Sequence, residues 1–342
     1  MKSLVIDQIS HTAFRDIPDP ALAPGEVLVD VRHVGLCGSD LSTFNGANPL
    51  VELPRIPGHE IGGVILETGP EVGADLAPGA RVVVIPYTTC GTCPACRRGR
   101  MNACQFNQTL GVQRDGGLCD RIALPADRLI VNDTLPVHQL ALVEPLSVGF
   151  HAVSRGEVTA DDTVLVLGGG MIGVGAVLGA QARGARVIVS EISARKSETL
   201  RKLGAEAVIN PMDTDLEQAV AELTDGRGAD VIIEAAGVAQ TFRLAVDLAP
   251  FTGRIVYIGY AKGEVAYETK FFNLKELDIR GSRNATRADF DAVIAYLEQH
   301  TDLADLLISK VFPWEQATQA FDHWVAHRDE TFKIMIDFGK DA

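Results

Sequence analysis

Four of the six cysteines in the chain fall within a stretch of fifteen residues, at Cys90, Cys93, Cys96 and Cys104. Four thiolates at this spacing can close a tetrahedron around Zn²⁺ and leave no position open for a substrate. The surrounding loop, about residues 88–105, has few apolar residues of its own, so a bound metal would supply the missing cohesion. The spacing therefore predicts a structural zinc.

These cysteines have other interpretations. A thioredoxin-like redox pair would account for one Cys-x-x-Cys, but not for two overlapping pairs followed by a fourth cysteine. Disulfides are not expected in a chain without an export signal. A cysteine-rich surface loop that has lost its metal stays as the alternative to a zinc site.

A second pattern with chemical meaning is the glycine-rich turn after the apolar run 164–167. Its glycines, Gly168, Gly170 and Gly173, have the spacing Gly-x-Gly-x-x-Gly. The apolar run predicts a buried parallel strand, and the turn leads into a helix whose amino end faces open space. Unpaired N–H groups and the positive end of the helix dipole make that end an anion site suited to a pyrophosphate. Taken alone, the same pattern also fits an ordinary glycine turn.

The next apolar run strengthens the prediction of a dinucleotide site. It covers residues 186–190 and ends in Glu191, eighteen residues after Gly173. A carboxylate at the tip of the second strand accepts hydrogen bonds from the adenine ribose and repels a 2′-phosphate. We therefore expect NAD rather than NADP. Arg195 and Lys196 stand nearby and would soften that preference, although they also fit a solvated helix start.

Size and composition limit the class of protein. At 342 residues the chain exceeds what one core usually supports, so we expect two domains. The net charge of −14 argues against nucleic acid or an anionic membrane as a partner, since both require a cationic surface. The sequence shows no signal peptide and no apolar run long enough to span a membrane, so we expect a cytoplasmic protein.

The hydrophobic pattern predicts the elements that position these motifs. Residues 1–147 are expected to be mostly β structure, with the cysteine loop as an excursion. From residue 148 strands and helices alternate, which predicts a doubly wound parallel sheet of six strands over 148–285. The tail, 286–342, is expected to rejoin the first region, with a helix over 315–326 and a closing strand over 332–338. The fold class is thus α/β, with the parallel sheet inserted in a mostly β domain.

Three further motifs precede the glycine turn: Cys37-Gly-Ser-Asp40, Gly58-His59-Glu60 and Val143-Glu144-Pro145. Together with the cysteine loop and the glycine turn, this order resembles the zinc-dependent medium-chain dehydrogenases, in the branch of sorbitol, L-threonine and sugar-acid dehydrogenases. The resemblance covers essentially the whole chain. Within that branch, the stretch 281–290 is most similar to the L-galactonate/L-gulonate 5-dehydrogenases.

The resemblance implies a fold and a chemistry. It implies a GroES-like catalytic domain (1–147 plus 286–342) around a Rossmann domain (148–285), and a homodimer or homotetramer. It implies NAD as cofactor and two Zn²⁺ per subunit, one catalytic and one structural. The implied reaction is hydride transfer from the secondary alcohol of a small molecule.

The predicted catalytic zinc would bind Cys37, His59 and a carboxylate, which leaves one open position. Zinc lowers the pKa of a coordinated hydroxyl from about 16 toward roughly 7. Glu60 and Glu144 are both candidates for the carboxylate. Individually, each residue also has an ordinary structural interpretation, as a loop histidine, a packed cysteine, a salt-bridge partner or a helix cap. Their joint occurrence favours the metal site.

The resemblance also assigns residues for the proton. Ser39 is expected to accept the alcohol proton, and Asp40 to lie behind His59 and orient its ring. Many relatives carry a histidine five residues after the zinc cysteine, where this chain has Ser42. Ser42, the cofactor ribose and water are therefore the alternatives for the proton exit. Cys119 is expected to be a packing residue.

Cofactor contacts are expected beyond the glycine turn and Glu191, at Met171, Ile172, Arg195, Lys196, Ala235, Ile258, Gly259, Ser282 and Arg283.

The expected substrate is a sugar acid, and Arg55, Arg114 and Arg283 are the cations considered for its carboxylate. A polyol or L-threonine as substrate stays open. A zinc-free quinone-type reductase would lack Cys37, His59 and the cysteine loop, and a nonenzymatic NAD-binding protein would have no need of them.

Overall fold

The computed structural model describes residues 1–340 and divides into two compact units. Unit 1 comprises Met1–Glu144 together with the segment that begins at Leu297, and unit 2 comprises Pro145–Tyr296. The boundaries fall inside helices α4 (Val143–Arg155) and α10 (Arg287–Gln299). In residues 1–340, no helix is long and apolar enough to cross a membrane.

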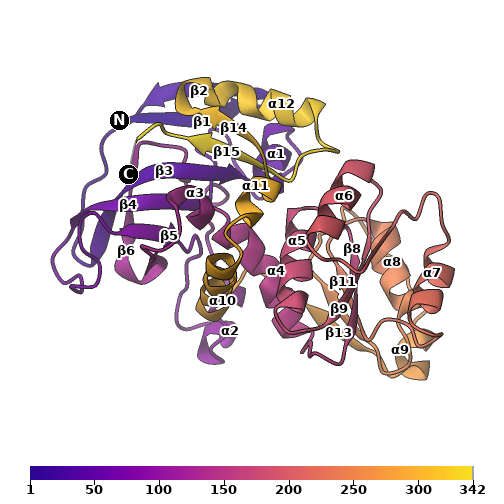
Figure 1. Ribbon diagram of the computed structural model, residues 1–342. Coiled ribbons are helices and arrows are strands. Elements are labelled where there is room, and N and C mark those ends of the chain that lie inside the picture. Colours follow the sequence, from indigo (N-terminus) through magenta and orange to yellow (C-terminus); the bar gives the residue numbers. More distant parts are fainter. Residues whose placement is uncertain (341–342) are drawn as a thin grey trace. The chain divides into compact units, whose positions relative to one another are not determined.

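Unit 1 is built on a seven-stranded sheet with the order β14-β15-β3-β4-β5-β7, in which β6 also pairs with β3 (Figure 1). A separate hairpin, β1-β2, completes its β structure. The strands are β1 (Lys2–Gln8), β2 (His11–Asp16), β3 (Glu26–Leu36), β4 (Glu60–Thr68), β5 (Arg81–Val84), β6 (Arg121–Pro125), β7 (Leu129–Val131), β14 (Ile308–Pro313) and β15 (Lys333–Asp337).

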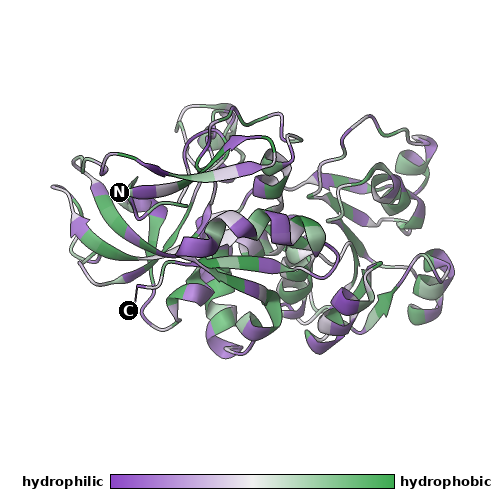
Figure 2. Cartoon of the chain, turned by 90° about the horizontal axis from the view of Figure 1, so that it is seen from above, coloured by the Kyte–Doolittle hydropathy of each residue, from purple (hydrophilic) through white to green (hydrophobic). Residues whose placement is uncertain are grey.

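The core of unit 1 follows from the apolar residues of these strands. Val27, Val29, Val31 and Val34 of β3 are fully buried and pack in one cluster with residues of β1, β4 and β15. Figure 2 shows the hydrophobic colour over much of these strands. The short helices of unit 1 are α1 (Gly38–Phe44), α2 (Pro94–Arg97), α3 (Val137–Leu140), α11 (Leu303–Leu307) and α12 (Ala320–Ala326).

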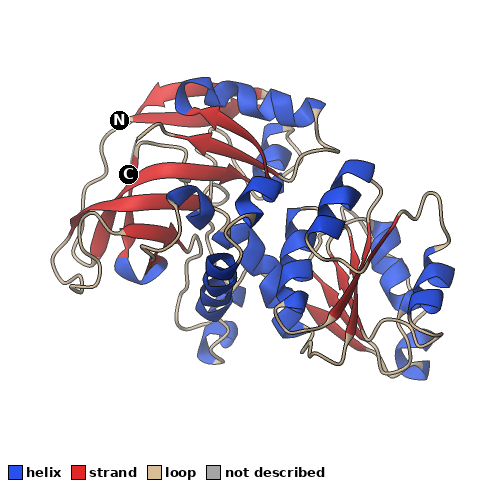
Figure 3. Cartoon of the chain, in the orientation of Figure 1, coloured by secondary structure: helices blue, strands red, loops and turns tan. Residues whose placement is uncertain are grey.

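Unit 2 is a six-stranded parallel sheet flanked by helices (Figure 3). Its order, β10-β9-β8-β11-β12-β13, reverses direction between β8 and β11. This is the doubly wound sheet that the sequence predicts. The elements are β8 (Thr163–Leu167), α5 (Met171–Gln181), β9 (Arg186–Ser190), α6 (Ala194–Lys202), β10 (Ala207–Ile209), α7 (Leu216–Leu223), β11 (Val231–Glu234), α8 (Ala239–Leu248), β12 (Arg254–Tyr257), α9 (Lys270–Leu274) and β13 (Asp278–Gly281).

Two details of the tail differ from expectation. Residues 286–296, expected with the first region, lie in unit 2. The reason is a buried hydrogen bond of 2.8 Å between His151 Nδ1 and Asp289 Oδ2, which ties α10 to α4. The expected helix over 315–326 is a 3₁₀ turn, η3 (Trp314–Gln319), followed by α12.

Candidate functional site

Cys37, His59 and Glu60 come together at one end of the β3–β4 ladder. Cys37 directly follows β3, and Glu60 begins β4. The antiparallel pairing of Gly35 with Glu60 fixes the register between the two strands. One ligand atom of each of the three side chains lies within 4.8 Å of the other two. The structure thus brings together three of the predicted catalytic donors.

The electrostatics of this cluster suit a cation. Asp40, Glu60 and Glu144 are all buried. His59 Nδ1 is also buried and has no hydrogen-bond partner among residues 1–340. Burial alone would lower the pKa of His59, but the negative charges of Cys37 and Asp40 outweigh burial and raise that pKa well above its ordinary value. A thiol, an imidazole and a carboxylate are donors that Zn²⁺ accepts. The residues present therefore fit a catalytic zinc.

The Glu60 carboxylate is held by a lysine that the sequence analysis missed. Lys333 Nζ donates to Glu60 Oε1 at 2.6 Å and to the Leu36 carbonyl oxygen at 2.9 Å. Both side chains are almost completely buried. Gly35 provides the space, because a Cβ at that position would collide with Glu60 Oε2. A lysine of β15 thereby fixes the carboxylate on β4 and the end of β3.

Glu144 stands apart from the three clustered donors, with a different partner. The hydroxyl of Tyr87 donates to Glu144 Oε1. Burial raises the pKa of Glu144, and burial and the Glu144 charge raise that of Tyr87 well above its ordinary value, so the phenol stays protonated as a donor. Glu144 is not among the residues within 4.8 Å of one another in the cluster. Tyr87, like Lys333, carried no recognisable signal in the sequence.

Asp40 lies beside His59 but does not hydrogen-bond to its ring. Its Oδ1 lies 4.0 Å from His59 Nδ1, beyond hydrogen-bonding distance. Its oxygens accept from the backbone N–H of Cys37 at 2.9 Å and of Gly58 at 3.3 Å. Because the carboxylate caps the first turn of α1, it fixes the backbone beside both ligands rather than the imidazole itself.

Two serines of α1 are the candidates for the proton path. Ser39 Oγ is buried and has no hydrogen-bond partner within the described chain. Ser42 follows three residues later and is half-buried. Residues three apart lie on the same side of a helix, so both hydroxyl groups face one side of α1.

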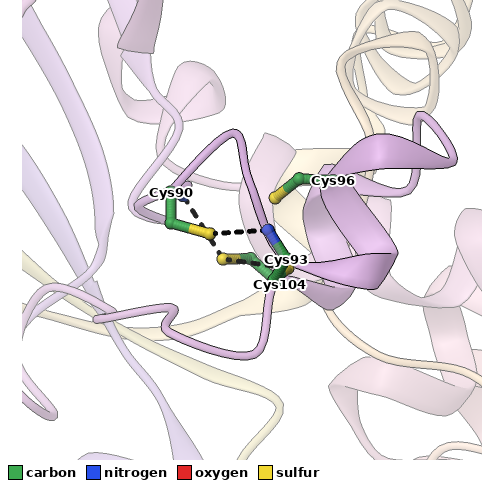
Figure 4. Close-up of side chains that lie close together, drawn as sticks. All are labelled: Cys90, Cys93, Cys96 and Cys104. Atoms are coloured by element: carbon green, nitrogen blue, oxygen red, sulfur yellow. Dashed lines mark hydrogen bonds between the residues drawn. The ribbon is translucent and has the colours of Figure 1, made fainter.

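The four loop cysteines point toward one another (Figure 4), and their sulfur atoms lie within 4.8 Å of each other. All are free thiols. Backbone N–H groups of Thr92 and Cys93 lower the pKa of Cys90 to about 6, which favours the thiolate that binds zinc. The donor set is complete and tetrahedral zinc would leave no open position, so the loop fits a structural zinc.

The predicted nucleotide residues of unit 2 meet at one edge of its sheet. Gly168 follows β8, Glu191 follows β9, Ala235 follows β11, Ile258 and Gly259 follow β12, and Ser282 and Arg283 follow β13. Carboxyl ends of parallel strands share an edge, and ligands of doubly wound sheets bind there, beside the point where strand order reverses.

The glycine turn has the shape that a phosphate requires. Gly168 has φ of 100°, and a Cβ at Gly173 would collide with the Gly168 carbonyl oxygen. A Cβ at Gly170 would meet nothing within 4 Å. Gly170 is also the N-cap of α5, where no side chain accepts a hydrogen bond. The first N–H groups of α5, beginning at Met171 and Ile172, are therefore free of a side-chain cap, as an anion site requires.

Glu191 contacts this turn directly. Its Oε2 accepts from Gly169 N at 2.8 Å and its Oε1 from Ser193 N at 2.7 Å. Arg195 is exposed and Lys196 half-buried in the first turn of α6. A carboxylate fixed beside the phosphate turn matches the position expected for a ribose-binding group.

Glu234 is a further buried carboxylate at this edge that the sequence analysis missed. It ends β11 and accepts from Ala236 N at 3.0 Å, Gly237 N at 2.8 Å and Thr241 Oγ1 at 2.7 Å. Burial raises its pKa. A carboxylate at the end of an apolar run was the available signal.

Comparisons with known proteins agree with zinc sites in unit 1 and a nucleotide site in unit 2. Residues 23–134 match the alcohol dehydrogenase GroES-like domain, and residues 172–299 match the zinc-binding dehydrogenase family. The chain is 33% identical to L-galactonate-5-dehydrogenase of Escherichia coli K12 over 338 residues, 99% of each chain. It is 32% identical to sorbitol dehydrogenase of Bacillus subtilis over 343 residues, 98% of this chain and 97% of the relative.

A solved structure of an alcohol dehydrogenase is also similar to this chain. The crystal structure of an alcohol dehydrogenase from E. coli CFT073, complexed with NADH, superposes with a TM-score of 0.92 at 30% identity over 99% of both chains. The chain therefore belongs to the zinc-binding, medium-chain alcohol dehydrogenase family. It is an oxidoreductase that depends on zinc and a nicotinamide dinucleotide, of the type that acts on alcohols, polyols and sugar acids.

Removing one loop cysteine tests the structural zinc. We expect Cys104→Ser to reduce the zinc content from two ions per chain to one, because three thiolates hold the ion less tightly than four. The unfolding midpoint should fall by about 5 °C or more as the loop loses its cohesion. Elemental analysis and thermal unfolding measure both effects. Cys119→Ser, which alters a buried cysteine outside the loop, should keep two ions; two ions in Cys104→Ser would contradict the assignment.

Proposed function

We propose that the chain oxidises a secondary alcohol of a sugar acid, of the L-galactonate or L-gulonate type at C5, to the ketone with NAD⁺ as hydride acceptor. The observation that carries the proposal is the cluster of half-buried Cys37 with buried His59 and Glu60, three donors that would leave one position of a bound zinc open. Similarity to an L-galactonate-5-dehydrogenase over nearly the whole chain supports the substrate class. We further propose a cytoplasmic homodimer or homotetramer.

In the proposed reaction a hydride leaves the alcohol carbon for the nicotinamide ring, and the hydroxyl proton leaves separately. Cys37, His59 and Glu60 would hold the zinc, which would supply positive charge that lowers the pKa of the alcohol. Ser39 accepts the hydroxyl proton, since its buried Oγ has no other partner within the described chain. Ser42, on the same side of α1, passes the proton outward.

Arg114 is the proposed partner of the substrate carboxylate. It belongs to the segment 111–117, which packs against the backbone before His59: Gly117 N donates to Gly58 O at 2.8 Å. Its Nε is buried without a hydrogen-bond partner in residues 1–340, and burial lowers its pKa. Arg55 is less suitable, because its guanidinium is paired with Asp115 at 3.2 Å. A half-buried guanidinium with a free donor is an effective binding group for a carboxylate.

The direct test is NADH formation with L-galactonate, L-gulonate, sorbitol and L-threonine, with zinc content measured on the same samples. We expect the highest kcat/KM with one of the two sugar acids. Highest activity with sorbitol would support a polyol dehydrogenase instead, and highest activity with L-threonine would support a threonine dehydrogenase. Full activity after complete removal of zinc would refute the mechanism.

Arg114→Ala tests the recognition of the carboxylate. We expect KM for the sugar acid to rise by about tenfold or more, because a charge-assisted hydrogen bond is lost, while KM for a neutral polyol changes little. Arg121→Ala serves as the control, since that guanidinium pairs with Asp19 at the surface. Equal losses for the acid and the polyol would exclude Arg114 as the carboxylate partner.

Glu191→Arg tests the preference for NAD. The substitution replaces a carboxylate that repels a 2′-phosphate with a cation that attracts it. We expect KM for NAD⁺ to rise about tenfold and the preference for NAD⁺ over NADP⁺ to disappear in steady-state kinetics. Glu198→Arg, at an exposed position of α6, makes the same charge change and should keep the preference. An unchanged preference in Glu191→Arg would rule out this role.

A further inference from the structure

Unit 1 contains a pocket of about 270 Å³ that none of the candidate catalytic donors lines. This volume lies just below the range of about 300–1,000 Å³ that is typical of small-molecule sites, so the pocket suits a compact ligand. Its basic lining residues are Arg32, His33, Arg81, His138 and Lys340, and its acidic lining residue is Asp337. In a chain with a net charge of −14, such a lining reverses the sign of the charge locally and favours an anion.

The pocket lies along the same strands as the catalytic donors but at a different position. Its basic side chains come from β3, β5, α3 and the segment after β15. On β3, His33 is paired with Gly62, whereas Gly35 is paired with Glu60. The pocket therefore begins two ladder positions away from the carboxylate of the catalytic cluster, about 7 Å along the strand.

The fixed charges of the pocket balance one another. Arg32 Nε and Lys340 Nζ share one carboxylate, that of Asp30, at 2.9 Å and 2.6 Å. Arg81 Nε lies 3.7 Å from Asp133 Oδ1, in a pair whose carboxylate is mostly exposed to solvent. With Asp337 counted, three cations face three carboxylates. The protonation of the two histidines therefore decides the net charge of the pocket.

The two histidines lie edge to face, with ring centroids 5.9 Å apart. His33 Nε2 lies 3.5 Å from Asp337 Oδ1, and its Nδ1 is buried with no hydrogen-bond partner in the part of the chain that the structure describes. Burial lowers the pKa of both rings; Asp337 opposes this effect at both, and Asp305 opposes it at His138, whereas His138 and Arg32 lower the pKa of His33 further. Both rings are therefore neutral near pH 7.

We propose that this pocket binds a small oxyanion with two negative charges, such as a phosphate group, beside His33 and His138. The anion accepts the hydrogen bond that His33 Nδ1 does not make within the chain. Its charge stabilises the protonated form of both rings. Binding therefore takes up protons, and the affinity for the anion rises as the pH falls. The proposal requires neither the catalytic zinc nor a sugar acid as substrate, so it stands or falls independently of the proposed function.

Sulfate is a suitable test anion because it keeps two negative charges at every pH used. Isothermal titration calorimetry on the full chain saturated with NADH measures its binding while the cofactor occupies the phosphate turn of unit 2. We expect one sulfate per chain, with a dissociation constant about tenfold lower at about pH 6 than at about pH 7.5. Inorganic phosphate should compete with it. No binding of sulfate, equal affinity at both pH values or no competition by phosphate would overturn the proposal.

His33→Asn and His138→Asn test the two rings separately. Each variant keeps a polar side chain that cannot be protonated, so the tenfold pH dependence of sulfate affinity should shrink to about threefold or less. His11→Asn is the matched control, because His11 is an exposed histidine beside Asp7, and it should behave like the native chain. Thermal unfolding shows which variants are folded, and either folded variant decides the question. An unchanged pH dependence in a folded variant of His33 or His138 would refute the role of that ring and with it the paired site.

Arg81→Ala and Arg114→Ala distinguish this pocket from the proposed substrate site. Arg81→Ala should weaken sulfate binding by about tenfold, because a cation of the pocket is lost. Arg114→Ala should leave the sulfate affinity within about twofold of the native value, since Arg114 does not line the pocket. Loss of binding in Arg114→Ala with normal binding in Arg81→Ala would place the anion at the substrate site and reject the proposal.

Discussion

Buried negative charge is the constraint on which unit 1 depends. A carboxylate removed from water destabilises the fold by several kcal/mol unless it is paired or hydrogen-bonded. Each buried carboxylate of the candidate catalytic site has its own partner: Lys333 for Glu60, backbone N–H groups for Asp40, and Tyr87 for Glu144. These partners still leave an anionic cluster around His59, and a divalent cation would complete the balance. We therefore expect metal binding to stabilise the folded state of this unit.

The candidate site of unit 2 binds an anion instead of a cation, and the backbone provides the binding groups for its phosphate. The glycine turn leaves the N–H groups at the start of α5 without a side-chain cap, and its second glycine faces open space. A helix end with unpaired donors attracts an anion, so the backbone at the start of α5 supplies a fixed partial positive charge. The carboxylate of Glu191 then discriminates between ligands at the adjacent strand end. The expected zinc site thus relies on buried negative side chains in unit 1, and the expected dinucleotide site relies on backbone N–H groups in unit 2.

The fold was largely predictable because its signals are local. Strand and helix periods in 148–285 predict the parallel sheet, and glycine spacing predicts the turn after β8. The place of residues 286–296 in unit 2 and the 3₁₀ turn η3 were not predictable in the same way. Their positions depend on tertiary contacts, such as the bond between His151 and Asp289, which join residues 138 positions apart. Local patterns contain no record of such contacts.

The candidate site shows the same division between local and distant information. Cys37, His59, Glu60 and the four loop cysteines stand in compact motifs, and resemblance connects those motifs to a metal. The residues that pair with the buried carboxylates do not stand in such motifs. Lys333 is 273 residues from Glu60, and Tyr87 is 57 residues from Glu144, and neither neighbourhood has a distinctive pattern. Sequence motifs indicate which buried residues carry charge. The residues that stabilise that charge lie on other segments, which the fold brings next to the motifs. In this family, variation in chemistry between relatives with the same motifs is therefore to be sought in those partners.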